Sequence, residues 1–360
     1  MLKALIIDDM RRRGGGQSYA KITASVLTEM GYDTYFLTNV DSVDGIAAGI
    51  VYKVEYEFRE NSFRIIDFLK IVGLRRQLSE IDISGFNVSI NNHPNVFIIN
   101  GKINILHGFS FLDPWVDEKG ELYSRLPPAI FRLINLYGIY NGSFFIPNSE
   151  YTRGISLRLF DELGLNVELG EVLNPPVPVK KVDVKEKKEQ VLLLGRISRH
   201  KGIEGVAKIA NENSISIVVA GYVNKGDENF VEKLRKEAGK NVKIMENVRE
   251  EEKERLMAES STVLSMNMKE HFGIAVAEAM NYGCIPVVPK SGGQWSDIVE
   301  FGKYGLGYDG QDELVAMLNK SFSYGKGERL RIAESVKRFS VQEFSRKIAN
   351  LIEEIIPIRK

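Results

Sequence analysis

Short apolar runs alternate along the chain with segments in which apolar residues recur at helical spacing. The first run is Leu2 to Ile7, and a helical pattern from Tyr19 to Met30 follows it and stops at Gly31. Tyr35 to Leu37 is the next apolar run. A strand, a helix and a strand in this order predict a βαβ unit, which requires a parallel sheet with a right-handed crossover.

A proline-rich segment interrupts this alternation near the middle of the chain. Residues 173–179 read Leu-Asn-Pro-Pro-Val-Pro-Val, and three prolines within four positions cannot continue a helix or a central strand. We therefore predict an amino-terminal domain over residues 1–176 and a carboxyl-terminal domain over 177–340. The helical periodicity that follows predicts a closing helix within 341–360.

The alternation on both sides of this segment predicts the α/β class, with two doubly wound domains. Further strands are expected at 88–90, 103–106, 144–146, 191–194, 215–220, 242–245, 262–265 and 285–288. Further helices are expected at 62–78, 128–140, 202–211, 228–238, 250–259 and 273–280. Open α/β sheets bind ligands at the carboxyl ends of their strands, so we expect the two sheets to face a common cleft.

A glycine-rich loop lies between the first predicted strand and the first helix, and residues 11–17 read Arg-Arg-Arg-Gly-Gly-Gly-Gln. Glycines allow a ligand to approach the backbone, and amides at a helix N-terminus favour an anion. The loop is neither a Walker loop nor G-x-G-x-x-G. A flexible turn with three solvated arginines is the simpler alternative.

A second loop, Gly195 to Gly202, follows the first strand of the second domain. It carries Arg196 and Lys201 between its two glycines. A guanidinium and an ammonium at this spacing can converge on one polyanion, such as a diphosphate. The alternative is a pair of surface cations, but the loop position and the glycine framing favour a function.

Two glutamates eight residues apart flank an aromatic-glycine turn. Glu270 precedes Phe272-Gly273, and Glu278 lies in a helix that is otherwise apolar from Ile274 to Met280. A charge in so apolar a helix is costly unless it is paired or hydrogen-bonded. Either the hydroxyls of a sugar or ribose, or a buried partner cation, would meet that requirement.

Ser291-Gly292-Gly293 follows the predicted strand at 285–288 and, taken alone, indicates only a turn. Asp297, four residues beyond Gly293, is expected to cap a helix.

The charge of the chain is balanced, with 48 Lys and Arg against 48 Asp and Glu. The balance hides two opposite halves, because residues 1–176 hold 17 basic and 21 acidic side chains and the remainder holds 31 and 27. The sequence indicates no dense basic face, which argues against a protein that tracks nucleic-acid phosphates. The single cysteine, Cys284, excludes an internal disulfide framework.

Membrane association is only weakly indicated. Asp8 and Asp9 directly follow the first apolar run, so the first residues are interpreted as a strand and not as a secretory signal. No stretch of about 18 consecutive apolar residues predicts a spanning helix, and we expect a cytoplasmic protein. Residues 63–76 and 129–137 mix cations with large apolar residues at helical spacing. Such helices can lie peripherally in a headgroup layer, although they more commonly pack on a core.

Together these motifs resemble the retaining GT-B glycosyltransferases of glycosyltransferase family 4 over nearly the whole chain. The Arg196 to Lys201 loop, the Glu270 to Glu278 pair and Gly292-Gly293 occur in the family's order and approximate spacing. In the first half, the resemblance includes the glycine loop, His107-Gly108, Ser149 and Asn174 to Val177. Residues 270–274 and 291–299 look most similar to mannosyltransferases that extend lipid-linked oligosaccharides. The chain departs from the family pattern at Asp297, at Asn174 and in the run Arg11 to Arg13.

The resemblance implies two Rossmann-like domains, with the closing helix crossing back. It also implies an enzyme that moves a hexose, such as mannose or glucose, from a nucleotide-diphosphate sugar to a hydroxyl of a glycan or lipid-linked glycan with retention. Arg196 and Lys201 would neutralise the diphosphate, Glu278 would bind the ribose and Glu270 the sugar hydroxyls. Further donor contacts would come from the backbone of Phe272, Gly273 and Ile274, and from the segment around Val248.

On the acceptor side, the resemblance implies that Gly15, Gly16 and Gln17 form the acceptor and phosphate loop. His107 would bind the donor sugar near the reacting centre, with a core histidine as the alternative. The implied catalytic residues are thus Glu270, His107, Arg196 and Lys201.

We expect no metal and no cofactor. The sequence has no Asp-x-Asp pair, and its four histidines lack ligand-like spacing. The expected partners are a nucleotide sugar and a glycan acceptor. Two other functions stay open: a two-domain protein that binds a nucleotide sugar without turnover, and a phosphorylase-like enzyme, for which no pyridoxal lysine can be identified. An oxidoreductase is disfavoured because neither half carries G-x-G-x-x-G after its first strand.

Overall fold

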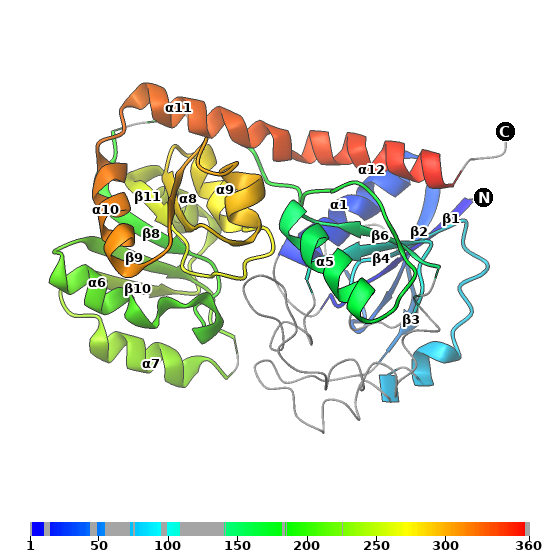
Figure 1. Cartoon of the computed structure of the whole chain (residues 1–360). Coiled ribbons are helices and arrows are strands. Elements are labelled where there is room, and N and C mark those ends of the chain that lie inside the picture. Colours follow the sequence, from blue (N-terminus) through cyan, green and yellow to red (C-terminus); the bar gives the residue numbers. More distant parts are fainter. Residues whose placement is uncertain are drawn as a thin grey trace. The chain divides into compact units, whose positions relative to one another are not determined.

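The computed structural model describes residues 2–10, 15–43, 49–54, 73–74, 76–94, 99–108, 140, 142–181, 184, 186–224 and 226–356. Two compact units make up the chain, one of Met1–Pro176 with Val341–Lys360 and the other of Val177–Ser340 (Figure 1). Arg11 to Arg13, most of the helix predicted at 62–78 and nearly all of the one predicted at 128–140 lie outside the described residues.

The first unit contains a seven-stranded parallel sheet in the order β3-β2-β1-β4-β5-β6-β7 among its described residues. The strands are β1 (Leu2–Ile7), β2 (Tyr32–Thr38), β3 (Gly49–Lys53), β4 (Val88–Asn91), β5 (Ile103–Leu106), β6 (Phe144–Pro147) and β7 (Glu168–Leu169). Its helices include α1 (Gly15–Glu29), α5 (Glu150–Glu162) and α12 (Val341–Ile355).

Side-chain alternation along β1 divides the core of this unit between the two faces of the sheet. Ala4 and Ile6 belong to the apolar cluster that also contains residues of α1 and α12. Leu5 and Ile7 belong to a second cluster that contains Leu74 and Leu78. Because successive residues of a strand point to opposite faces, a fully apolar strand predicts a sheet covered on both sides, as found here.

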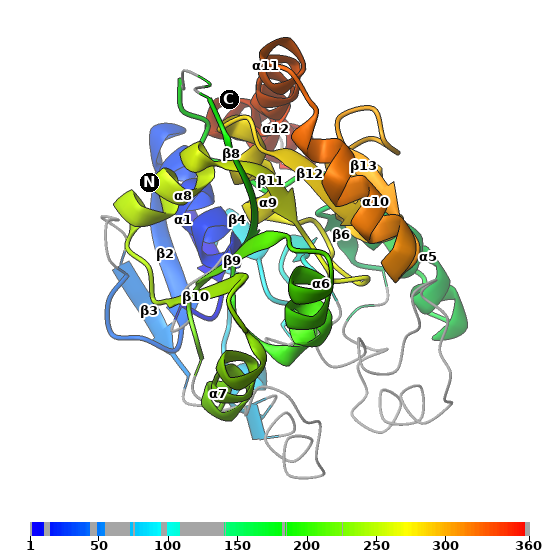
Figure 2. The same cartoon turned by 90° about the vertical axis from the view of Figure 1, so that its left-hand side faces the viewer.

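The second unit contains a six-stranded parallel sheet in the order β10-β9-β8-β11-β12-β13 (Figure 2). Its strands are β8 (Lys188–Leu194), β9 (Ser216–Gly221), β10 (Val242–Glu246), β11 (Ser260–Leu264), β12 (Ile285–Pro289) and β13 (Leu306–Tyr308). Its α-helices are α6 (Val206–Glu212), α7 (Glu228–Glu237), α8 (Glu250–Glu259), α9 (Ile274–Asn281), α10 (Gln311–Phe322) and α11 (Lys326–Ser335).

The predicted fold class is confirmed: both units are parallel, doubly wound α/β structures. The hydrophobic pattern located most strands to within three residues, but it did not single out α5, α10 or α11. Two local predictions were wrong. The helix expected from Gly202 begins only at Val206, after two short 3-10 turns. Asp297 does not cap a helix, because it lies inside the π-helical turn Gln294–Ile298, where it accepts a hydrogen bond from Ser296 Oγ.

The closing helix α12 belongs to the first unit although it follows the second in sequence. Phe344, Ile348 and Ile352 recur every four residues and are all buried in the same cluster as α1. The Phe344 ring meets the Tyr19 ring edge-on, with 4.6 Å between centroids. The last helix is therefore part of the core of the first unit.

We expect Phe344→Ala to lower the free energy of unfolding of the first unit by about 3 kcal/mol, because a buried aromatic ring is replaced by a cavity. Asn350→Ala, at an exposed position of the same helix, is the control and should change it little. Calorimetry that resolves the transitions of the two units provides the measurement. Equal effects of the two variants would show that α12 is not part of this core.

Candidate functional site

The predicted donor residues lie where the strand order of the second sheet reverses. The sheet continues in opposite directions from the neighbouring strands β8 and β11. The loop 195–202 leaves the carboxyl end of β8, and residues 265–273 leave the carboxyl end of β11. Such a reversal leaves a crevice between the two loops, which is where doubly wound sheets bind ligands.

An ion pair joins these two loops. Lys201 Nζ lies 2.5 Å from Glu270 Oε2, and Asn267 Nδ2 donates to the same oxygen at 3.2 Å. The Lys201 and Glu270 side chains are 32% and 21% exposed, so the pair is shielded without being sealed from solvent. Burial alone would raise the pKa of Glu270, but Lys201 and Asn267 together hold this pKa below its ordinary value. The carboxylate is therefore ionised at neutral pH.

Glycines allow the backbones around this pair to approach closely. Gly202 has φ +69°, and a Cβ there would lie 2.7 Å from the Met266 carbonyl oxygen. A Cβ on Gly292 would lie 2.6 Å from the Glu270 carbonyl oxygen, and one on Gly293 only 2.0 Å from that of His271. Gly292-Gly293, which the sequence showed only as a turn, thus packs directly against the backbone that carries Glu270.

Two amide side chains that the sequence did not indicate support Glu270. Asn267 donates to its carboxylate, and Gln294 Nε2 donates to the Asn267 carbonyl at 2.8 Å. Gly293 N donates to the Glu270 carbonyl at 2.8 Å. The position of Asn267 three residues before Glu270 is the one sequence signal that could have identified it, whereas the partners of Gln294 are distant in sequence.

The start of α9 presents backbone where a donor diphosphate was predicted. Gly273 has φ +104° and caps the helix, and Ile274 is its first residue. The Phe272 side chain is only 2% exposed and contacts the Phe339 ring edge-on. Phe272 therefore anchors the turn in the core, and its backbone is the part suited to contact a ligand.

Glu278 has a partner cation, which confirms the alternative that the sequence left open. Lys253, on the first turn of α8, lies 3.3 Å from Glu278 and 2.8 Å from Glu250. Burial raises the pKa of Glu278, while Lys253 partly offsets this increase. Lys253 was missed because a pairing between α8 and α9 leaves no local pattern. The role of Glu278 toward a ribose stays a prediction.

The other predicted donor residues lie on the same edge of the sheet. Arg196 is half-buried on the loop after β8. Val248 lies between β10 and α8, and its side chain packs against the core. The donor role of Arg196 and of the backbone around Val248 stays a prediction.

The predicted residues of the first unit also gather at carboxyl strand ends. His107 follows β5, and its Nε2 lies 2.7 Å from Asn92 Oδ1 after β4. Asn92 Nδ2 donates to the Gly16 carbonyl at 3.1 Å, which links His107 to the first turn of α1. Gln17 Nε2 donates to the Asp9 carbonyl at 2.8 Å. Gly15 begins α1, and a Cβ on Gly16 would meet no described atom within 4 Å outside its own turn of the helix.

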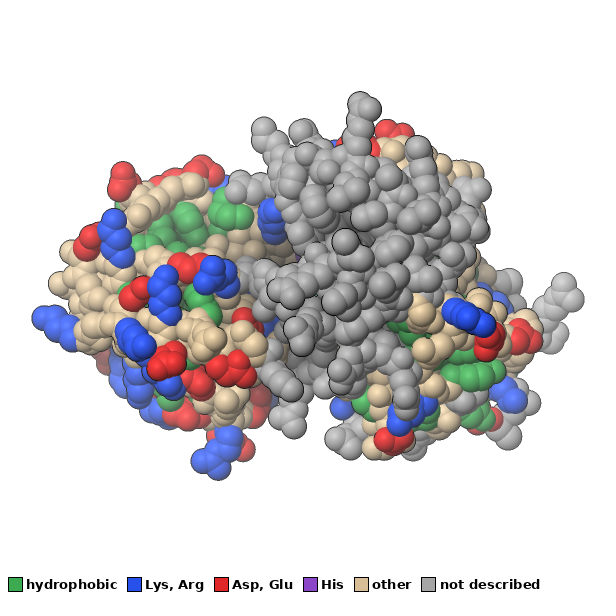
Figure 3. Space-filling model, turned by 90° about the horizontal axis from the view of Figure 1, so that it is seen from below, with side chains coloured by type: hydrophobic (Ala, Val, Ile, Leu, Met, Phe, Trp, Pro, Cys, Tyr) green, Lys and Arg blue, Asp and Glu red, His purple; other side chains and the backbone are tan. Residues whose placement is uncertain are grey.

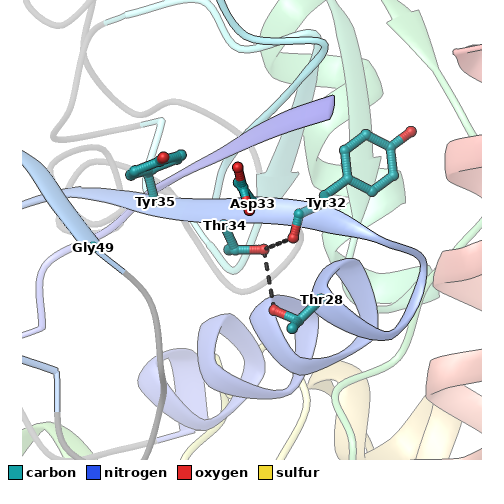
Figure 4. A pocket seen from close by; sticks show the side chains of 6 residues that line it. All are labelled: Thr28, Tyr32, Asp33, Thr34, Tyr35 and Gly49. Atoms are coloured by element: carbon teal, nitrogen blue, oxygen red, sulfur yellow. Dashed lines mark hydrogen bonds between the residues drawn. The ribbon is translucent and has the colours of Figure 1, made fainter. Parts of the chain in front are cut away.

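A small pocket lies at the opposite edge of this sheet and is unrelated to these residues. It has a volume of about 240 Å³ at the start of β2 (Figure 4). Its lining consists of Thr28, Tyr32, Asp33, Thr34, Tyr35 and Gly49. Tyr32 and Thr34 alternate with Asp33 and Tyr35 along the strand, so the lining comes from both faces of the sheet.

Basic and acidic side chains are interspersed over the described surface of the face in Figure 3. Among the described residues, no group of three His, Cys, Asp or Glu side chains is placed to hold a metal ion. The described helices also include none long and apolar enough to cross a membrane.

Comparison with known proteins finds similarity to glycosyltransferases. Residues 179–339 match the family model described as "Glycosyl transferases group 1". A Xenopus laevis GDP-Man:Man(3)GlcNAc(2)-PP-Dol alpha-1,2-mannosyltransferase is 34% identical over 154 residues, which are 40% of this chain and 31% of that protein. A Clostridium perfringens glycogen synthase is 26% identical over 158 residues, 42% of this chain and 30% of that protein. The chain thus spans about a third of the length of these relatives.

Solved structures resemble the whole chain in fold. Sucrose-phosphate synthase from Thermosynechococcus elongatus has a TM-score of 0.73 at 13% identity, with 99% of each chain covered. WaaG, a glycosyltransferase of lipopolysaccharide biosynthesis, has a TM-score of 0.67 at 16% identity, covering 98% of this chain and 99% of that one. The fold is therefore the GT-B fold of these solved structures, and the second unit is the part of the chain that matches the glycosyl transferases group 1 model.

We expect Lys201→Met to lower the free energy of unfolding of the second unit by about 2 kcal/mol at neutral pH, because it leaves Glu270 without its cation. The lowered pKa of Glu270 means that the pair stabilises the fold above the ordinary carboxyl pKa of about 4.3. This stabilisation is lost as the pH falls through the lowered pKa that Glu270 has in the folded protein. The difference between variant and wild type should thus shrink on acidification, as measured by chemical unfolding across pH.

Lys290→Met is the matched control for this experiment, because Lys290 pairs with Asp309 and Glu313 in a more exposed setting. We expect a loss of less than about 1 kcal/mol, as is usual for surface ion pairs. A Lys201→Met penalty that does not change with pH would contradict the assignment of Glu270 as the ionised partner.

We expect Gly293→Ala to displace the backbone that carries Glu270, since its Cβ would overlap the His271 carbonyl. The variant should have a lowered melting temperature and weaker binding of any ligand held by Glu270. Gly310→Ala is the control, because a Cβ at Gly310 would meet nothing within 4 Å and its φ of −146° suits any residue. Calorimetry of both variants tests this, and equal melting temperatures would contradict the close packing.

Proposed function

We propose that this protein is a retaining glycosyltransferase that moves a hexose from a nucleotide-diphosphate sugar to a hydroxyl of a glycan or lipid-linked glycan, without a metal ion. The observation that carries the proposal is the position of the Lys201–Glu270 pair. It joins the two loops at the strand reversal of the unit that matches the glycosyl transferases group 1 model. A cation for the diphosphate and a carboxylate for sugar hydroxyls are the two groups that a nucleotide sugar requires.

The ion pair accounts for how the site could stay charged before the donor binds. The bond to Lys201 lowers the pKa of Glu270, which keeps this carboxylate ionised, and it orients both side chains. A bound donor would bring a negative diphosphate to Lys201, helped by Arg196 on the same loop, and sugar hydroxyls to Glu270. Each of the two charges then has a partner on the ligand. The contacts with the ligand therefore offset most of the free-energy cost of removing the charges from water.

The start of α9 would stabilise the leaving group. The backbone amides of Gly273 and Ile274 and the helix dipole favour negative charge, which grows on the diphosphate as the glycosidic bond breaks. Glu278 on the same helix would accept hydrogen bonds from the ribose, and Lys253 favours its ionised form. A cationic loop together with helix amides would serve the role that a metal ion has in other transferases.

Transfer with retention requires that the acceptor and the leaving group share one face of the sugar. The acceptor oxygen would bond to the anomeric carbon as the bond from that carbon to the phosphate oxygen breaks. The acceptor proton would pass to the departing phosphate. The open space beside Gly16 supports the first unit as the acceptor side, and His107, linked to Gly16 through Asn92, would bind the donor sugar.

The names of the relatives suggest which donors to test first. Several matched relatives are mannosyltransferases whose names specify GDP-mannose, and others are glycogen synthases. We therefore propose mannose from GDP-mannose as the first candidate and glucose from ADP-glucose or UDP-glucose as the second.

A thermal-shift screen of these nucleotide sugars tests the donor, because a ligand that binds only the folded protein raises its melting temperature. Incubation of the selected donor with glycan acceptors, with and without a chelator, then tests transfer. NMR of the anomeric centre of the product determines retention or inversion. Donor binding without transfer or hydrolysis would favour the non-catalytic binding protein, and an inverted product would refute retention.

We expect Gly16→Ala to separate stability from activity. A Cβ there meets no protein atom, and alanine in a helix is favoured over glycine, so the free energy of unfolding should rise by up to about 1 kcal/mol. The added methyl group would occupy the space proposed for the acceptor, so the rate of transfer should fall. Gly154→Ala, on α5 with equally open surroundings, should leave the rate unchanged. Equal rates for both variants would remove Gly16 from the acceptor site.

Peripheral membrane contact stays a prediction, because the amphipathic segments 63–76 and 129–137 lie almost entirely outside the described residues. Sedimentation with anionic and with neutral liposomes would test it. Absence of the protein from both pellets would argue against a membrane-bound acceptor site.

A further inference from the structure

We propose that Asn92 is a positioning residue that ties the glycine loop to His107 and holds this histidine as the neutral imidazole protonated on Nε2. Its consequence for sugar transfer rests on the proposed function. Its structural part does not, and it can be measured on the protein alone.

The Asn92 side chain lies at the centre of a buried polar network. It follows β4 directly and is only 2% exposed. Its Nδ2 donates to Asp8 Oδ2 at 2.8 Å and to the Gly16 carbonyl at 3.1 Å. Its Oδ1 lies 2.7 Å from His107 Nε2. One amide thus connects the end of β1, the start of α1 and the end of β5.

The partners of Asn92 fix the orientation of its amide group. The Gly16 carbonyl can only accept a hydrogen bond. This bond therefore requires the NH₂ group of Asn92 on the side of Gly16, where it also meets Asp8 Oδ2. The oxygen of Asn92 then faces His107 and can only accept, so His107 Nε2 must carry a proton.

The other nitrogen of His107 faces a donor. Asn148 Nδ2 lies 3.5 Å from His107 Nδ1. Thr152 Oγ1 donates to Asn148 Oδ1 at 2.7 Å, which turns the NH₂ group of Asn148 toward the histidine. A proton on Nδ1 would oppose this NH₂ group, so the network favours the neutral ring with its lone pair on Nδ1.

Asp8 anchors the network from the other side. This carboxylate is fully buried and accepts from Asp9 N at 2.7 Å, and His93 Nδ1 lies 3.4 Å from it. Tyr19 meets the His107 ring edge-on, with 4.8 Å between centroids. Four strand ends and α1 therefore hold His107 in one orientation, which makes it a fixed hydrogen-bonding group and not a mobile general acid.

The arrangement has a consequence for the reaction. The glycine loop and His107 come from separate segments, and among the described residues Asn92 bonds to both. If Gly16 borders the acceptor and His107 the donor sugar, Asn92 sets the distance between the two substrates. Loss of Asn92 should then impair the reacting geometry more than donor binding.

Nitrogen-15 NMR of the histidine rings in the ligand-free protein tests the tautomer. The chain has only four histidines, and a His107→Gln sample assigns the signals of His107. We expect the neutral Nε2–H form at neutral pH. A protonated Nδ1, in either the other tautomer or the imidazolium, would overturn the proposal. This readout requires no substrate and no variant of Asn92.

Two variants test the role of Asn92 itself. Asn92→Ala removes the acceptor for Nε2–H, so the His107 signals should show a mixture of tautomers. Asn92→Asp keeps an acceptor toward His107 but no donor toward Gly16, and its negative charge favours the imidazolium, so Nε2 should keep its proton in either ring state. Unchanged His107 signals in Asn92→Ala would show that another group holds the ring. If Asn92→Ala does not fold, loss of the proton on Nε2 in Asn92→Asp would overturn the proposal instead.

Kinetics with the donor selected by the thermal-shift screen test the consequence of Asn92 for sugar transfer. Asn92→Ala should lower kcat by about 10²-fold, as misplaced reactants commonly do, with a much smaller change in the KM of the donor. Asn39→Ala is the matched control, because Asn39 is a buried asparagine that donates to Asp9 and has no bond to His107. Equal kcat values for the two variants would overturn the positioning role. Absence of transfer by the wild type would instead refute the proposed function and leave the NMR result standing.

Discussion

The reversal of strand order in each parallel sheet is the constraint on which the candidate site depends. A doubly wound sheet starts with a central strand and adds neighbours first on one side and then on the other. Here β1 and β4 in the first unit, and β8 and β11 in the second, are the strands at which the order reverses. Loops that leave their carboxyl ends diverge and leave room for a ligand, and these are the loops that carry Gly16, Asn92, Lys201 and Glu270.

Within the second unit, the charges at this point stay close to solvent but are held rigidly. Lys201 and Glu270 come from different loops, so their pairing requires both backbones to be fixed. The glycines at 202, 292 and 293 supply that rigidity, because each lies where a Cβ would strike a carbonyl group. The same close packing limits how far either charge can move when a ligand arrives. A preorganised pair of opposite charges is suited to a ligand that carries both an anionic and a hydroxyl-rich part.

The first unit achieves rigidity by a different means, since amide side chains at its edge bond to buried carboxylates and to the backbone. Asn39, Asn92 and Asn148 each bond to a neighbouring polar group at a carboxyl strand end. Buried amides of this kind are costly unless both their donors and their acceptors are satisfied, and they therefore fix orientation as well as position. The closing helix α12 adds to this rigidity through Phe344, which packs against Tyr19 and so lies one ring from His107.

The sequence by itself determined the fold class, because fully apolar strands alternating with amphipathic helices have few solutions other than a covered parallel sheet. It also indicated Lys201, Glu270 and the glycine turns, since glycine and charge leave local marks beside a strand end. Only the tertiary structure decided the pairing of Lys201 with Glu270, of Lys253 with Glu278, and of Asn92 with both Asp8 and His107. Each of these contacts joins loops or helices that the strand order brings together from separate parts of the chain. A local pattern carries no information about such a contact until the order of the strands is known.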